Sequence, residues 1–83
     1  MEVHLNVLKT LDDVLALGGR TQHWTRDTAL LGAVPELDSM AVVMLVTELG
    51  ERFGITIEDD DIDGSVFATV GALCDFVSAR IPA

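Results

Sequence analysis

The sequence is poor in cysteine, aromatic residues and positive charge, and these shortages exclude several classes of function. Its 83 residues contain one cysteine, Cys74, which excludes an internal disulfide and a multi-cysteine metal site and suits a reducing compartment. Five Lys and Arg stand against 14 Asp and Glu, giving a formal net charge of −9. Such a chain is unsuited to nucleic acid and to anionic membranes, whereas a basic patch on a partner protein would attract it.

Long hydrophobic runs and targeting segments are also missing. The longest apolar run, from Met40 to Val46, is far shorter than a membrane span, and the start of the chain lacks the basic region of a signal peptide. We therefore expect a cytoplasmic protein that does not bind membranes. The length predicts a single small domain over residues 1–83, which we expect to be a monomer.

The patterns of catalytic and metal-binding sites are absent as well. Ser39 does not lie in the G-x-S-x-G turn of a hydrolase, and neither His4 nor His23 has a cysteine or acidic residue at ligand spacing. Cys74 is interpreted as a small core or boundary residue rather than a nucleophile. We expect no catalytic residues, no metal and no enzymatic activity.

Three stretches have the apolar spacing of amphipathic helices, which predicts an all-α fold, a small bundle of three to four helices. The predicted helices cover residues 3–17, closed by Gly18-Gly19, residues 39–53, closed by Gly54, and residues 69–81, closed by Pro82. A short fourth helix or turn is expected around Asp60–Ile62. The predicted core residues are Val7, Leu8, Leu11, Val14 and Leu15 in the first helix and Val70, Leu73, Phe76, Val77 and Ile81 in the last.

The connection over residues 18–37 is long for a compact domain. Such loops are either functional or held in place by their own side chains, and we expect Leu30 and Leu31 to hold this one. Trp24, in the same connection, is expected to cover the edge of the core. Ile55 and Ile57, which follow the second helix, are predicted to be buried.

The start of the second helix is the strongest candidate for a functional site. Asp38 and Ser39 directly precede an apolar run with helical spacing, and side chains of these types satisfy unpaired amides at helix N-termini. Ser39 therefore lies at or next to the positive end of a helix dipole, a position that suits a phosphate-bearing group.

Helical projection divides this second helix into two faces. The predicted core stripe consists of Val42, Leu45, Val46, Leu49 and Phe53, and the opposite face consists of Met40, Val43, Met44, Thr47, Glu48 and Glu51. The first turn of that opposite face is too apolar for a surface that meets only water. It indicates a helix on which another protein docks.

The run Asp38-Ser39-Met40, followed by Val43, Leu45-Val46, Leu49, Glu51 and Phe53-Gly54-Ile55, resembles the signature of the acyl carrier protein family. Ile57, the acidic residues 58–61 and the run Thr69-Val70-Gly71-Ala72-Leu73 extend the resemblance over nearly the whole chain. It implies that Ser39 carries phosphopantetheine, whose terminal thiol holds an acyl or aminoacyl group as a thioester.

The resemblance also implies the partners. A phosphopantetheinyl transferase would read Asp38 and modify Ser39, and an acyl- or aminoacyl-activating ligase and acyltransferase-type enzymes would then use the arm. The implied partner-binding residues are Met40, Val43, Met44, Glu48 and Glu51.

The second helix departs from the acidic pattern of the best-known fatty-acid carriers. Ala41, Met44, Gly50 and Arg52 stand where those carriers often have acidic residues. A discrete carrier dedicated to one lipid, secondary-metabolite or exopolysaccharide pathway fits this sequence better than a general fatty-acid carrier.

Two alternatives remain open at this stage. Asp59, Asp61, Asp63 and Gly64 match the first positions of an EF-hand calcium loop, although Val70 replaces the glutamate that closes such a site. The second alternative is a helical adaptor that is never modified.

Overall fold

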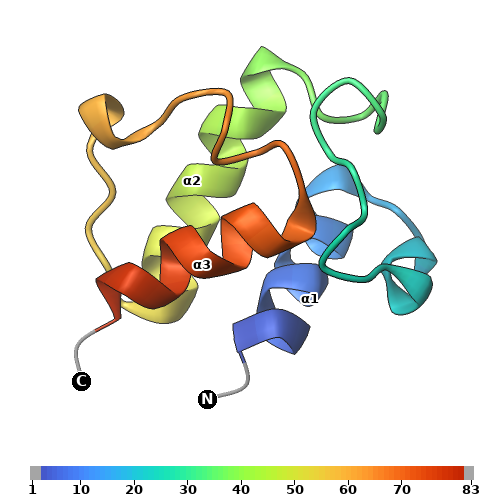
Figure 1. Cartoon of the computed structure of the whole chain (residues 1–83), viewed down its shortest axis with the longest axis horizontal. Helices are drawn as coiled ribbons and strands as arrows, with labels where there is room; N and C mark the ends of the chain where they lie inside the picture. Colours follow the sequence, from blue (N-terminus) through green and yellow to red (C-terminus); the bar gives the residue numbers. More distant parts are fainter. Residues whose placement is uncertain (1–2, 82–83) are drawn as a thin grey trace.

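The computed structural model describes residues 3–81 and consists of helices joined by loops (Figure 1). In chain order the elements are α1 (Val3–Leu15), the 3-10 helix η1 (Arg20–His23), α2 (Ser39–Phe53), the 3-10 helix η2 (Asp59–Asp61) and α3 (Val70–Arg80). The β-type pairing in this range is one isolated bridge between Ala29 and Thr69. The predicted all-α bundle is confirmed, with three α-helices over the described residues; the expected fourth helix is the single turn η2.

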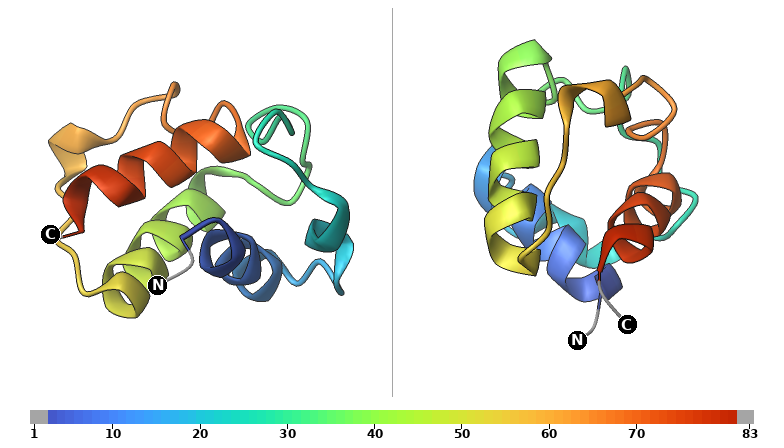
Figure 2. Two further views of the ribbon diagram at one scale, coloured as in Figure 1. Left: turned by 60° about the horizontal axis from the view of Figure 1, so that its bottom comes forward. Right: turned by 90° about the vertical axis from the view of Figure 1, so that its left-hand side faces the viewer.

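Helix α1 is the common neighbour of the other two helices. It packs against both α2 and α3, which lie on either side of it in the right-hand view of Figure 2. One cluster of buried side chains fills the space between them. Its fully buried large members are Val7, Leu11, Leu30, Leu45, Leu49, Val70, Leu73 and Val77. None of the helices in residues 3–81 is both long and apolar enough to cross a bilayer.

The end of α1 differs from the prediction. The helix ends at Leu15 rather than Leu17, because Ala16 takes the left-handed conformation (φ 54°) and the Leu17 amide donates to the Asp12 carbonyl at 3.0 Å. This is a Schellman closure formed without glycine. Gly18 and Gly19 do have positive φ, but they serve the turn into η1.

The buried side of α1 is broader than the predicted stripe. Val7, Leu8, Leu11 and Leu15 are buried as predicted, whereas Val14 is only partly buried. Thr10, which the pattern did not predict as a core residue, is fully buried and donates its hydroxyl to the Asn6 carbonyl at 2.7 Å. That bond within the helix lets a polar residue occupy a core position.

The long connection before α2 is held by backbone pairing as well as by side chains. Leu30 and Leu31 donate their amides to Ala68 (3.0 Å) and Phe67 (2.9 Å). Leu30 is fully buried, whereas Leu31, in the turn that follows, is 48% exposed. The prediction was therefore right for Leu30 and wrong for Leu31. Trp24 packs against the core edge as expected.

The C-terminal part of the core agrees largely with the prediction. Val70, Leu73 and Val77 are fully buried, Phe76 and Ile81 are partly buried, and Cys74 is a core residue at 3% exposure. Pro82 lies outside the described residues. Thr69 caps α3 by accepting the Ala72 amide at 3.1 Å.

Gly71 is required where the connection before α2 crosses the start of α3. Its amide donates to the Arg26 carbonyl at 2.8 Å, and a Cβ at this position would lie 3.0 Å from that oxygen and 3.1 Å from the Arg26 Cβ. Gly71→Ala should therefore force the two segments apart and lower the free energy of unfolding by about 1–3 kcal/mol, as overpacking does. Thermal or urea unfolding measures this loss.

Gly64→Ala is the matched control, because a Cβ at residue 64 meets nothing within 4 Å. If the two alanine variants were equally stable, the close approach at Gly71 would not matter for the fold.

Candidate functional site

Asp38 caps the N-terminus of α2, and the Ser39 side chain takes no part in the cap. The Asp38 carboxylate accepts the Ala41 amide at 2.8 Å, and the Asp38 carbonyl accepts the Val42 amide at 2.9 Å. Ser39 is the first residue of the helix, as its position in the sequence predicted, and it is exposed. Its hydroxyl makes no hydrogen bond within residues 3–81. Ser39 is therefore not the cap of this helix.

This arrangement presents an exposed hydroxyl at a capped helix terminus. The unpaired amides of the first turn give that end a partial positive charge, which favours an attached or bound anion. A phosphate ester on Ser39 would project into solvent and gain from this charge. Phosphopantetheine therefore fits the residues at this end of α2.

The two predicted faces of α2 are confirmed in outline. Leu45, Leu49 and Phe53 are buried, whereas Val42 and Val46 are only partly buried. Ala41, which the projection did not place in the core, is buried. On the outer side, the apolar face consists of Met40, Val43 and Met44, which are 71%, 64% and 54% exposed.

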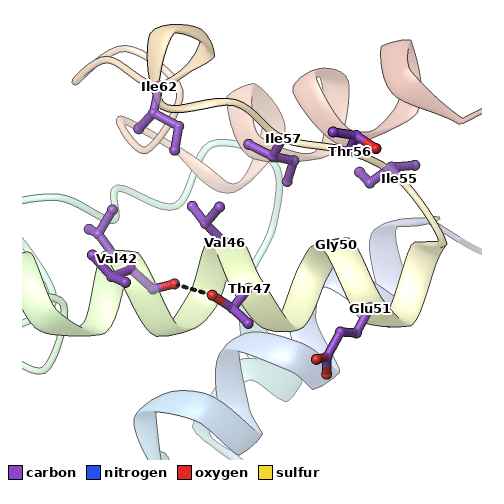
Figure 3. A pocket seen from close by; sticks show the side chains of 10 residues that line it. Val42, Val46, Thr47, Gly50, Glu51, Ile55, Thr56, Ile57 and Ile62 are labelled. Atoms are coloured by element: carbon purple, nitrogen blue, oxygen red, sulfur yellow. Dashed lines mark hydrogen bonds between the residues drawn. The ribbon is translucent and has the colours of Figure 1, made fainter.

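A groove runs along α2 between the helix and the segment of residues 55–62 (Figure 3). Its volume is about 530 Å³, and its lining residues are Val42, Val43, Val46, Thr47, Gly50, Glu51, Ile55, Thr56, Ile57 and Ile62. Ile55 and Ile57 are partly buried rather than buried, which corrects the prediction, because they form the wall of this groove. The groove was not predicted from the sequence, although the row of isoleucines after α2 (Ile55, Ile57 and Ile62) could have indicated it.

Gly50 allows this wall to approach the helix. Ile55 donates its amide to the Gly50 carbonyl at 3.1 Å, and a Cβ on residue 50 would lie 3.2 Å from the Ile55 carbonyl oxygen. Gly54, in the left-handed conformation (φ 64°), ends α2 as predicted and turns the chain back along the groove. The glycine inside α2 thus serves close packing.

Two arginines bind carboxylates at either end of the outer face of α2. Arg20 of η1 forms an ion pair with Glu36, and its donated hydrogen bond lowers the pKa of that carboxyl below its usual value. Arg52 binds Glu48 (2.8 Å) on its own helix and Asp13 (3.0 Å) on α1. Hydrogen bonds to Glu48 and then Asp13 raise the pKa of the Arg52 guanidinium. Of the two predicted partner-binding acids, Glu48 is paired and Glu51 is exposed.

Two carboxylates of the acidic segment after α2 are engaged within the chain. Asp61 accepts the Glu58 amide at 3.1 Å and pairs with Arg80 at 3.1 Å, and Asp63 binds the Ser65 hydroxyl. Val70, at the closing position, is fully buried. Among the described side chains, which do not include that of Asp59, no three His, Cys, Asp or Glu residues gather as a metal site.

Helix packing brings together one pair that sequence spacing did not indicate. The Cys74 sulfur lies 3.8 Å from Nδ1 of His4 on α1. Burial raises the pKa of the Cys74 thiol, which disfavours the reactive thiolate. This agrees with the interpretation of Cys74 as a core residue.

Comparisons with known proteins indicate the family of the chain. A family model described as a phosphopantetheine attachment site matches residues 36–77. Among solved structures, the chain is similar to the holo acyl carrier protein of Nitrosomonas europaea, with 44% identity, a TM-score of 0.88 and coverage of 95% of both chains. A comparison with curated proteins gives no significant match.

The division of α2 into faces is tested by a pair of alanine variants. Leu49→Ala removes a side chain that is 1% exposed and should lower the free energy of unfolding by about 2–5 kcal/mol. Met44→Ala removes an exposed side chain and should change it by less than about 0.5 kcal/mol. Chemical denaturation measures both values, and equal losses would show that the faces are assigned wrongly.

Proposed function

The chain belongs to the acyl carrier protein family and carries covalently attached phosphopantetheine, and from this premise we propose that Ser39 is the attachment residue. As a carrier protein it is not itself an enzyme. The cap is the observation that supports attachment at Ser39 most directly. Asp38 accepts the hydrogen bond of the Ala41 amide, so the exposed Ser39 hydroxyl is not needed to cap the helix.

In this proposal, separate enzymes modify and load the protein. A phosphopantetheinyl transferase catalyses attack of the Ser39 oxygen on the pyrophosphate of coenzyme A. The phosphopantetheine phosphate becomes an ester of Ser39, 3′,5′-ADP leaves and the hydroxyl proton is released. Asp38 is the neighbouring residue that the transferase reads. The attached arm supplies a thiol on which an acyl or aminoacyl group is held as a thioester. The chain supplies a rigid helix terminus and a tether, which gives the cargo a high effective concentration at each partner's active site.

The groove beside α2 gives the cargo a place away from water. Val42, Val46, Ile57 and Ile62 supply apolar surface along it, and it lies on the same helix as Ser39. An acyl chain placed there would bury apolar surface, and each Å² removed from water would stabilise the bound chain by about 25 cal/mol. A partner enzyme then has to draw the chain out of the groove before it can act on the thioester.

The apolar face, together with Glu48 and Glu51, forms the proposed partner-binding surface. Ala41, Met44, Gly50 and Arg52 leave α2 with little acidic character, so electrostatic attraction to a basic enzyme is weak. We propose a discrete, monomeric carrier, a single cytoplasmic domain over residues 1–83. It would serve an acyl- or aminoacyl-activating ligase and acyltransferase-type enzymes of a dedicated lipid, secondary-metabolite or exopolysaccharide pathway.

Incubation of the apo protein with coenzyme A and a broad-specificity phosphopantetheinyl transferase tests the site. Intact mass spectrometry should show the addition of one phosphopantetheine, and Ser39→Ala should abolish it. Because Asp38 is the cap, Ser39→Ala should change the free energy of unfolding by less than about 0.5 kcal/mol.

Ser78→Ala, at an exposed serine on α3, is the matched control and should be labelled like the wild type. Modification of a folded Ser39→Ala variant would disprove the assignment of the attachment residue.

A further inference from the structure

The wall of the groove is a segment that is tied to the rest of the fold near its ends. We call this segment, residues 55–62, the strap. At its start the Ile55 amide donates to the Gly50 carbonyl at 3.1 Å. Among the described residues, the backbone groups of residues 56–66 form hydrogen bonds only within residues 58–68. Backbone pairing therefore does not attach the middle of the strap to α2 or α3.

The strap also has few packing contacts with the helices on either side of it. Helices α2 and α3 both pack extensively against α1, whereas over the described residues their contact with each other is slight and η2 packs extensively against none of the three. In the right-hand view of Figure 2 the strap runs along α2 on the side toward α3. A segment with so few packing contacts can move at a low cost in free energy while the helices stay folded.

One carboxylate fixes the far end of the strap. Asp61 accepts the Glu58 amide through Oδ2 at 3.1 Å, which closes the turn of η2. Its other oxygen, Oδ1, accepts a hydrogen bond from Nη2 of Arg80 on α3 at 3.1 Å. The next residue, Ile62, lines the groove. The ion pair therefore joins α3 to the strap directly beside the groove wall.

Arg80 is held in position for this ion pair by its own helix. Its guanidinium lies over the Phe76 ring, with Cζ 3.8 Å from the ring centroid. The two side chains of the Arg80–Asp61 pair are 27% and 33% exposed, whereas those of the Arg26–Asp75 pair, also on α3, are 57% and 70% exposed. A guanidinium that is stacked on a ring and partly shielded from water forms a better-defined pair than an exposed one.

The charge of the strap opposes its closed position. Residues 58–61 are consecutive acidic residues, and their mutual repulsion favours a more open arrangement. Among the described side chains, Arg80 is the cation that pairs with this run. The other arginines, Arg20, Arg26 and Arg52, pair with carboxylates elsewhere. Loss of the Arg80 charge would therefore leave the repulsion within the strap unopposed.

We propose that Arg80 is a positioning residue that holds the strap across the groove through Asp61, and that this ion pair limits the length of the acyl group that the groove accepts. The inference rests on the proposed placement of the cargo in the groove. While the pair is formed, the isoleucines of the strap lie opposite the valines of α2, and the groove keeps its width (Figure 3). When the pair opens, the strap can move away from α2 and admit a longer chain.

Methyl NOEs in the apo protein test the role of the ion pair without any attached group. The wild type should show NOEs between the methyl groups of Ile62 and Val42, and these should weaken or disappear in Arg80→Gln. Asp61→Asn, which keeps an oxygen to accept the Glu58 amide, should have the same effect. The double variant should lose no more than either single variant, because both remove one interaction.

Arg26→Gln is the matched control. It removes the same charge and breaks the other ion pair of α3, so it should leave the NOEs across the groove unchanged. Full NOEs in Arg80→Gln, or additive losses in the double variant, would overturn the proposal.

Thermal unfolding of acylated forms tests the limit on cargo length. The transferase loads hexanoyl- or hexadecanoyl-phosphopantetheine from the corresponding acyl-coenzyme A, and intact mass confirms one adduct. In the wild type the hexadecanoyl form should melt less than about 2 °C above the hexanoyl form, because the closed strap leaves the rest of the chain in water. In Arg80→Gln the difference should exceed about 4 °C, and in Arg26→Gln it should equal that of the wild type.

The same difference in Arg80→Gln and the wild type, or no change of Tm with either acyl group, would overturn the proposed limit on length. Absence of the adduct would instead contradict attachment at Ser39. In that case the NOEs of the apo protein would still decide whether Arg80 holds the strap, so the two failures are distinguishable.

Discussion

The hydrogen bond from the Ala41 amide to the Asp38 carboxylate determines where α2 begins, and the proposed attachment site depends on it. The cap places Ser39 at the first helical position without using its hydroxyl. Burial of Leu45, Leu49 and Phe53 then holds the helix against α1, so this terminus is formed without an attached group. Attachment at a preformed terminus requires no refolding of the carrier.

The rest of α2 combines three tasks on one helix. The inner side belongs to the core, the side toward residues 55–62 forms the groove, and the outer side exposes Met40, Val43 and Met44. The buried stripe alone keeps the helix in place, and the exposed residues are therefore free to serve recognition. Gly50 allows the groove to form, because the absence of a Cβ lets the chain after Gly54 pack close to the helix.

The bounds of α2 could be predicted from the sequence because both signals are local: Asp38 caps one end and Gly54 ends the other. The all-α fold and the outer face follow from periodicity. Features that depend on packing could not be predicted in this way. Leu31 is exposed because the pairing with residues 67–68 sets its direction, and Ala16 ends α1 without a glycine signal. The groove, the Arg20–Glu36 pair and the Arg52–Asp13 pair require the folded chain.

The preformed, capped terminus is tested most directly by amide hydrogen exchange of Ala41, followed by NMR in the apo and phosphopantetheine-bearing forms. The account predicts that this amide is protected in both forms, with chemical-shift changes confined to the start of α2 and the groove. Rapid exchange of the Ala41 amide in the apo form, or shifts that spread through α1 on attachment, would contradict it.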